Sequence, residues 1–468
     1  MKTHAPLARL ARLTPLAATV LAALPAFAQD LTVKAPPQTR PIAIVNATIH
    51  PVSGEPVADG AILFAEGLIV GVYDRASWPD ALRAAGGEQR VALIDAGGQH
   101  VYPGLISPYS QLGLTEIQAV RQTNDTAETG DFSPEVVAVT AVNPDSTLLP
   151  VTRSNGVLVA GVFPTGGIVP GRASVIRLDG WTTGEMAVAA QAGLIVRWPS
   201  TRTFTAWWMD RSEEDQQRDA QRALTRIREI FDAAEAYHAQ RTADPGAPID
   251  LRWEAMRAVF GTRQSASDSG AQPPSMPVYV LANDLDQING AVTFFAERGL
   301  RCVIVGGRDA DRCAELLTKH GVPVILSSGT FVMPRRADSP YDDAFSLPAR
   351  LHGAGITFAI AVGDDTAHER NLPYAAAMAA AHGLPADAAL RAITLDAARV
   401  LGVADRYGSL DAGKSATLIL TTGTPLEVTT QVRRAFIDGR EIDLSNKQTK
   451  LYEKYRERYR QTGDLKEP

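Results

Sequence analysis

Residues Val278–Val305 read VYVLANDLDQINGAVTFFAERGLRCVIV, and their pattern indicates the fold class. Two apolar runs of strand length, Val278–Ala282 and Arg301–Val305, stand on either side of a helical stretch. Strands that are apolar throughout are typical of a sheet buried on both faces, and strands that alternate with helices are typical of a parallel sheet with crossover helices. The stretch therefore predicts one strand–helix unit of an α/β fold.

The same rhythm runs through the middle of the chain. Eight apolar runs of strand length follow one another there: Tyr102–Ile106, Gly156–Phe163, Ala173–Leu178, Gly193–Trp198, Val278–Ala282, Arg301–Val305, Pro323–Leu326 and Thr357–Val362. Eight strand–helix units predict a closed (β/α)8 barrel of the TIM type. An open, doubly wound sheet is the alternative that the spacing alone leaves open.

The regions before and after the barrel have β character instead. Short β-branched runs separated by turn signals fill residues 41–102, and similar runs return after residue 403. We expect residues 29–102 and 403–445 to pair into one small composite β-sandwich beside a barrel made of residues 103–402. The last segment, 446–468, is expected to be a charged helical tail.

The expected tail carries Tyr452, Tyr455 and Tyr459 on one helical stripe. Such a stripe predicts either docking on the parent fold or a contact with a second subunit.

Charge and cysteine content exclude several classes of function. The 468 residues include 46 Lys and Arg against 52 Asp and Glu, a net charge of −6. No nucleic-acid partner is predicted, because phosphate binding needs clustered cations. Cys302 and Cys313 are too few for a disulfide scaffold or a four-thiolate zinc site. We interpret them as buried thiols, with a single bridge left open for an oxidising compartment.

Residues 1–28 are typical of a secretory signal peptide. Lys2, Arg9 and Arg12 precede the short apolar run Leu16–Leu24, and Ala26-Phe27-Ala28 has the small–x–small pattern of a cleavage site. The alternative is a membrane anchor, but the run is too short for a bilayer core of about 30 Å. We expect a periplasmic or secreted protein, cleaved near Ala28, with no integral membrane segment after cleavage.

Several segments carry a family resemblance. They are Val101-Tyr-Pro-Gly-Leu-Ile-Ser-Pro-Tyr-Ser-Gln-Leu-Gly113, Pro164–Arg177, Asn371–Tyr374, Thr394–Ala398 and Gly408-Ser-Leu-Asp-Ala-Gly-Lys-Ser-Ala-Thr-Leu-Ile419. They resemble the amidohydrolase superfamily, and Pro164–Arg177 is similar to its imidazolonepropionase-like branch. The resemblance covers about residues 41–445. It implies a (β/α)8 barrel with a composite β-sandwich, and the hydrolysis of non-peptide C–N bonds in amides or cyclic amides by one or two divalent metals such as zinc.

The resemblance also implies where metal ligands should stand. The superfamily has a His-x-His pair after strand 1, a Lys or Glu on strand 4, a His after strands 5 and 6, and an Asp after strand 8. The matching positions here hold, in that order, Tyr109 and Gln111, Arg197, Leu281, Gly306 and Gly307, and Asp365. A catalytic zinc normally needs three protein ligands of the imidazole, thiolate or carboxylate kind. We therefore expect no metal cofactor, and a pocket lined by the replaced positions.

One acidic segment remains a candidate for catalysis. Asp364-Asp-Thr-Ala-His-Glu-Arg370 follows the last predicted barrel strand, and His368 is the one histidine expected at the mouth of the barrel. In one interpretation Asp365 is a general base and His368 its partner. In the other, Asp365 caps a following helix and pairs with Arg370. Asp365 and His368 are our catalytic candidates.

Two functions fit these departures from the family pattern. The first is a weakly active hydrolase of the amidohydrolase type with an altered, metal-free site. The second is a pseudoenzyme that binds a small amide-like ligand or pairs with an active amidohydrolase. A homo-oligomer and a hetero-oligomer of that kind are the expected assemblies.

Overall fold

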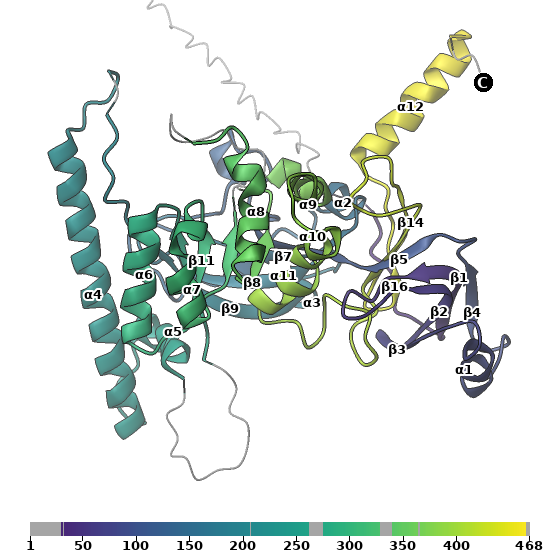
Figure 1. Ribbon diagram of the computed structural model, residues 1–468, viewed down its shortest axis with the longest axis horizontal. Coiled ribbons are helices and arrows are strands. Elements are labelled where there is room, and N and C mark those ends of the chain that lie inside the picture. Colours follow the sequence, from purple (N-terminus) through teal and green to yellow (C-terminus); the bar gives the residue numbers. More distant parts are fainter. Residues whose placement is uncertain are drawn as a thin grey trace, which may run out of the picture.

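The strands in the described part of the chain form two separate eight-stranded sheets (Figure 1). The computed structural model describes residues 30, 32–205, 207–261, 275–327, 339–363 and 366–464. The first sheet occupies the middle of the molecule, and the second lies at one end, where the purple N-terminal strands meet the yellow C-terminal ones.

The first sheet is the predicted barrel. Its strands are β6 (Leu105–Ser110), β7 (Val157–Val162), β8 (Gly171–Arg177), β9 (Ala187–Arg197), β10 (Val278–Ala282), β11 (Cys302–Gly306), β12 (Val324–Leu326) and β13 (Phe358–Ile360). They pair in sequence order, and β13 comes back against β6, so the sheet is nearly closed. Each of the eight predicted runs overlaps one of these strands, and the barrel is confirmed over the open alternative.

Strand β8 departs from the regular strand–helix pattern, because it pairs antiparallel with both β7 and β9. Only residues 163–170 separate β7 from β8, and a crossover to a parallel strand needs about a dozen residues or more. The chain must therefore turn back as a hairpin. The mouth of the barrel, at the C-terminal ends of the parallel strands, is formed by the loops after β6, β7 and β9 to β13.

Helices cover the outside of the barrel. They include α2 (Leu148–Arg153), α4 (Glu213–Ala243), α5 (Leu251–Phe260), α6 (Leu285–Glu297), α7 (Ala314–His320), α8 (Asp343–Gly353), α9 (Leu372–Ala381), α10 (Ala386–Ala392) and α11 (Leu395–Val400). The long helix α4 begins after the capping residue Ser212, whose hydroxyl accepts a hydrogen bond of 3.1 Å from the Asp215 amide. Its Phe231 packs edge-on against Phe294 of α6, at 5.7 Å between ring centroids.

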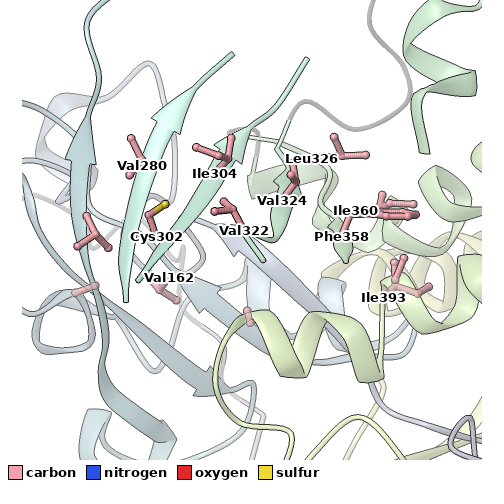
Figure 2. Packing of buried hydrophobic residues seen from close by; sticks show 14 of the residues in the cluster. Val162, Val280, Cys302, Ile304, Val322, Val324, Leu326, Phe358, Ile360 and Ile393 are labelled. Carbon is pink, nitrogen blue, oxygen red and sulfur yellow. The ribbon is translucent and has the colours of Figure 1, made fainter. Parts of the chain in front are cut away.

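The barrel strands alternate between an outer and an inner hydrophobic cluster. Val280 and Ile304 belong to the outer cluster under the helices, together with Cys302 (Figure 2). Tyr279 and Val303, each one residue away, point into the lumen instead. Both faces of the barrel sheet are therefore apolar, and this explains why the strand sequences form continuous apolar runs.

The two cysteines are free and buried, as interpreted from the sequence. Burial raises the pKa of the Cys302 thiol to about 12 and that of Cys313 to about 11.

The second sheet joins the two β-rich regions of the chain. Its strands are β1 (Ile42–Ile49), β2 (Val57–Ala65), β3 (Leu68–Tyr73), β4 (Ala92–Asp95), β5 (His100–Pro103), β14 (Leu418–Thr421), β15 (Val432–Ile437) and β16 (Arg440–Glu441). Strands β5 and β14 pair antiparallel and so connect the early strands to the late ones.

This sheet curls around its own core. Phe64 of β2 and Phe436 of β15 contact each other at 5.2 Å between ring centroids, although β14, β5 and β1 lie between their strands in the sheet. In a flat sheet four strand spacings would separate them by about 19 Å. The curled sheet is the composite β unit that the sequence predicts.

A buried ion network connects the barrel, the second sheet and the N-terminal segment. The Arg153 guanidinium lies 3.5 Å from an Asp30 carboxylate oxygen and 3.4 Å from one of Asp179. Arg440 of β16 reaches the other Asp179 oxygen at 3.1 Å, and Lys34 pairs with Asp30 at 3.5 Å.

The remaining elements are short, apart from the last helix. They are α1 (Trp78–Ala84), α3 (Thr183–Met186), α12 (Lys447–Thr462) and the 3-10 turns η1 (Arg121–Thr123), η2 (Ala138–Ala141), η3 (Ala310–Cys313) and η4 (Thr366–Asn371). Over the described parts of the chain, every helix is too short or too polar to cross a bilayer.

Candidate functional site

The described residues at the positions where the resemblance expects metal ligands lie at or near the mouth of the barrel. Tyr109 is the next-to-last residue of β6, and Gln111 directly follows that strand. The C-terminal ends of β9, β10 and β11 hold Arg197, Leu281 and Gly306. Because these strands are parallel, their C-terminal ends share one edge of the sheet. The structure therefore brings these predicted positions together around one opening.

Aromatic rings fill the lumen behind this opening. The ring centroid of Tyr109 is 5.0 Å from that of Phe163, which in turn is 5.0 Å from that of Tyr279. The Tyr279 hydroxyl donates a hydrogen bond of 3.1 Å to the carbonyl oxygen of Val400, at the end of helix α11. Burial raises the pKa of Tyr279 above its ordinary value, so this hydroxyl stays protonated.

Leu281 and Arg197 are register partners on neighbouring strands but face different surroundings. Leu281 is partly buried and packs against the lumen cluster. Arg197 is exposed, and its backbone amide donates to the Ile168 carbonyl at 2.9 Å. Gln111, next to Tyr109, is buried.

The glycines at the end of β11, Gly306 and Gly307, leave no room for a side chain. Gly306 and Gly307 have φ values of 115° and 66°. A Cβ on Gly306 would lie 2.6 Å from the Asn283 amide oxygen and 2.8 Å from the Ala282 carbonyl oxygen, and one on Gly307 would lie 2.4 Å from Val324. Both are closer than real Cβ atoms approach their neighbours.

Polar side chains at the rim hold neighbouring loops together. Asp284 caps helix α6 in a capping box with Gln287, whose amide nitrogen donates 2.8 Å to the carbonyl oxygen of Trp198 after β9. An Asp309 carboxylate oxygen, after β11, accepts a hydrogen bond of 3.1 Å from the Leu285 amide. These carboxylates satisfy backbone groups of the loops.

Of the two catalytic candidates, the structure describes only His368. His368 lies in turn η4 and is exposed, whereas Asp365 lies outside the described residues. Glu369, which follows His368, is fully buried. The distance between Asp365 and His368, and with it their predicted partnership, stays a prediction.

Apart from Asp365, which the structure does not describe, the residues at the expected ligand positions do not fit zinc. Tyr109, Gln111, Arg197, Leu281 and the two glycines supply no imidazole, thiolate or carboxylate. Among the residues that the structure describes, no group of three or more His, Cys, Asp or Glu is close enough to hold a metal ion.

The sequence reasoning missed Phe163 and Tyr279 as parts of the site. A usable signal was present for Tyr279, because residues two apart on a strand share a face and Leu281 was already placed at the mouth. For Phe163 the preceding strand is apolar on both faces, so no pattern in the sequence marks its direction.

Comparisons with known proteins agree with this architecture. A model of the amidohydrolase family matches residues 286–442. An imidazolonepropionase of Mesorhizobium japonicum is 26% identical over 398 residues, which are 78% of this chain and 86% of the relative. The amidohydrolase tasK of Hapsidospora irregularis is 23% identical over 407 residues, 81% of this chain but 39% of that longer protein.

A solved structure resembles the fold. The crystal structure of an amidohydrolase from Thermotoga maritima has a TM-score of 0.72 at 22% identity, and the match covers 86% of this chain and 99% of that one. The barrel and the composite sheet have the fold of this amidohydrolase structure, residues 286–442 match the amidohydrolase family model, and the chain is similar in sequence to an imidazolonepropionase.

Proposed function

We propose that this protein is a non-hydrolytic member of the superfamily, which acts by binding a small amide-like ligand or a related subunit. The observation that carries the proposal is the packed lumen: Tyr109, Phe163, Tyr279 and Leu281 form part of one apolar cluster where a metallohydrolase needs ligands and a water. None of these four side chains carries a charge that could activate a water molecule for hydrolysis.

We also propose that the protein works in the periplasm. The support is the basic, apolar and small-residue pattern of residues 1–28.

The metal content of the purified mature chain, residues 29–468, tests the non-hydrolytic proposal. The protein is produced with zinc and manganese supplied, gel-filtered, and measured by inductively coupled plasma mass spectrometry. We expect far less than one metal ion per chain, and no turnover of a panel of N-acyl amino acids and cyclic amides above the buffer rate.

A double variant, Asp365→Ala with His368→Ala, is the matched control. Both proteins should contain the same trace of metal. One or two ions per wild-type chain that disappear in the variant would contradict the proposal, because the segment after β13 would then be a metal site.

A second candidate function is a hydrolase with a rebuilt, metal-free site. One observation favours it: Glu369, next to His368 in the chain, is completely buried, and buried carboxylates are uncommon on structural grounds and frequent at functional sites. By the name of its relative, this candidate would act on small cyclic amides. It requires measurable turnover that Asp365→Asn or Glu369→Gln abolishes while the fold is kept.

A further inference from the structure

Helix α12 is a well-formed helix that none of the described parts of the chain covers. Asn446 caps its start through hydrogen bonds from the amides of Gln448 and Thr449, and Gly463 ends it in the left-handed conformation. None of its residues is buried, and Figure 1 shows it projecting from the body of the molecule. An isolated helix of this length is marginal in water, so a covered face would stabilise it.

One face of α12 is suited to a contact. Tyr452, Tyr455 and Tyr459 are 63%, 45% and 46% exposed, and Leu451 beside them is 41% exposed. Tyrosine rings supply a large contact area for little loss of side-chain freedom. We call these four residues the tyrosine stripe.

A row of unpaired cations runs beside the tyrosine stripe. Lys450, Lys454 and Arg458 are four residues apart and so lie in line on the helix. The two acids of the helix, Glu453 and Glu457, pair with Arg456 and Arg460 instead. Within the described residues the three cations of the row have no ion pair, and the helix carries six basic and two acidic residues.

The complementary charge lies in the long loop between β6 and β7. Residues 115–145, the acidic loop, hold six acids and one base. Asp125, Glu128 and Asp131 are exposed, and over the described parts of the chain none of them has an ion pair. Ile117 and Val120 in the same loop are exposed apolar residues. The loop thus offers unpaired acids beside an apolar surface, which matches the cations and tyrosines of α12.

The root of α12 is close to one end of the acidic loop. The Arg153 side chain donates 3.2 Å to the carbonyl oxygen of Asp443, just before the helix. It also pairs with Asp30, whose amide donates 2.6 Å to the carbonyl oxygen of Asp145. The helix therefore starts beside the acidic loop but points away from the rest of its own chain. In a dimer with a two-fold axis, the α12 helix of each copy could then reach the acidic loop of the other copy.

We propose that α12 docks on the acidic loop of a second copy of this chain, so that two copies exchange their helices in a symmetric dimer. The row of cations faces the carboxylates of the partner's loop, and the tyrosine stripe covers its apolar residues. The proposal is independent of catalysis and holds for either function above.

A charge-exchange experiment on the mature chain tests this. Variant one is Lys454→Glu with Arg458→Glu, and variant two is Asp125→Lys with Glu128→Lys. Each alone places like charges together in both contacts, so each should raise the dimer dissociation constant at least about tenfold, as seen by analytical ultracentrifugation. Mixed one to one, they should form a heterodimer, because both contacts are then complementary again.

Two further variants complete the test. Arg312→Glu with Lys319→Glu changes the net charge as variant one does, at exposed positions on η3 and α7, and should leave the dimer intact. Tyr452→Ser with Tyr455→Ser should weaken the dimer while circular dichroism shows an unchanged fold.

Three results would overturn the proposal. They are a wild-type chain that stays monomeric at every concentration, a dimer that neither charge variant weakens, and variants that remain monomers when mixed. The last would show that the helix docks on the loop of its own chain.

Discussion

Gly306 shows at the scale of one residue why the expected histidine is absent after the sixth barrel strand. Its backbone has a φ of 115°, a value that is favourable for glycine alone. The Asn283 amide and the Ala282 carbonyl fill the space that a side chain would occupy. A ligand histidine could not be restored here by substitution alone. A histidine at this position would therefore require a different backbone conformation as well as a different side chain.

We expect Gly306→Ala to lower the free energy of unfolding by about 2–4 kcal/mol, because the new Cβ meets a backbone oxygen as well as an unfavourable φ. Gly299→Ala is the matched control: its φ is 64°, yet nothing lies within 4 Å of the added Cβ. The control should cost only about 1 kcal/mol. Urea unfolding followed by circular dichroism measures both free energies. Equal losses of stability in the two variants would contradict the prediction, because they would show that the neighbours of Gly306 move aside for the new Cβ.

Much of the candidate site could be read from the sequence, but not the way its residues are used. The family resemblance placed Tyr109 and Leu281 at the ends of two barrel strands, and in the structure they are the next-to-last residues of β6 and β10. The lumen packing of Phe163 stayed hidden, because the preceding strand β7 is apolar on both faces. The helix-capping use of Asp284 depends on where α6 begins, which is a boundary rather than a composition.

Among the secondary-structure elements, the apolar runs predicted where the strands lie but not whether neighbouring strands run parallel or antiparallel. The run at Ala173–Leu178 looked like its neighbours, and β8 there is antiparallel because the preceding loop is too short for a crossover. The curled second sheet was predictable, since residues far apart in the chain had the same β-branched composition and no other partner for their apolar faces.

The pairing of β1 with β5 places a half-buried histidine pair side by side, and this pair should make stability depend on pH. The rings of His50 and His100 approach to 3.0 Å between Nε2 and Nδ1, and Tyr102 stacks on His50 at 4.2 Å. Burial, and then the charge on His100, lower the pKa of His50 from 6.5 to about 4.

Between these two pKa values the unfolded chain binds a proton that the folded chain does not. The contribution of His50 is therefore fully present above pH 6.5 and is lost as the pH falls towards 4. For a half-buried pair we expect a loss of about 1–2 kcal/mol. Urea midpoints at the two ends of this window measure it.

His50→Gln should remove this part of the pH dependence, and the exposed His352→Gln should keep it. An unchanged slope in His50→Gln would assign the effect to other groups.

At the scale of the whole molecule, Arg153 is the residue on which three parts of the chain converge. It is 1% exposed and pairs with Asp30 of the N-terminal segment and with Asp179, which Arg440 of the second sheet also binds. Removing one partner of a buried ion network leaves the others uncompensated. Arg153→Met should therefore cost about 3–5 kcal/mol of unfolding free energy, more than any exposed pair.

The exposed pair of Arg226 and Glu229, 3.2 Å apart on α4, supplies the control. Arg226→Ala should cost about 0–1 kcal/mol in the same urea titration. If the network truly couples the two sheets, the wild-type chain unfolds in one transition, whereas Arg153→Met unfolds over a broader range or in two steps, because the second sheet can then separate from the barrel. A single sharp transition with a loss near that of the control would show that the strand pairing and apolar contacts between the sheets hold them together without this network.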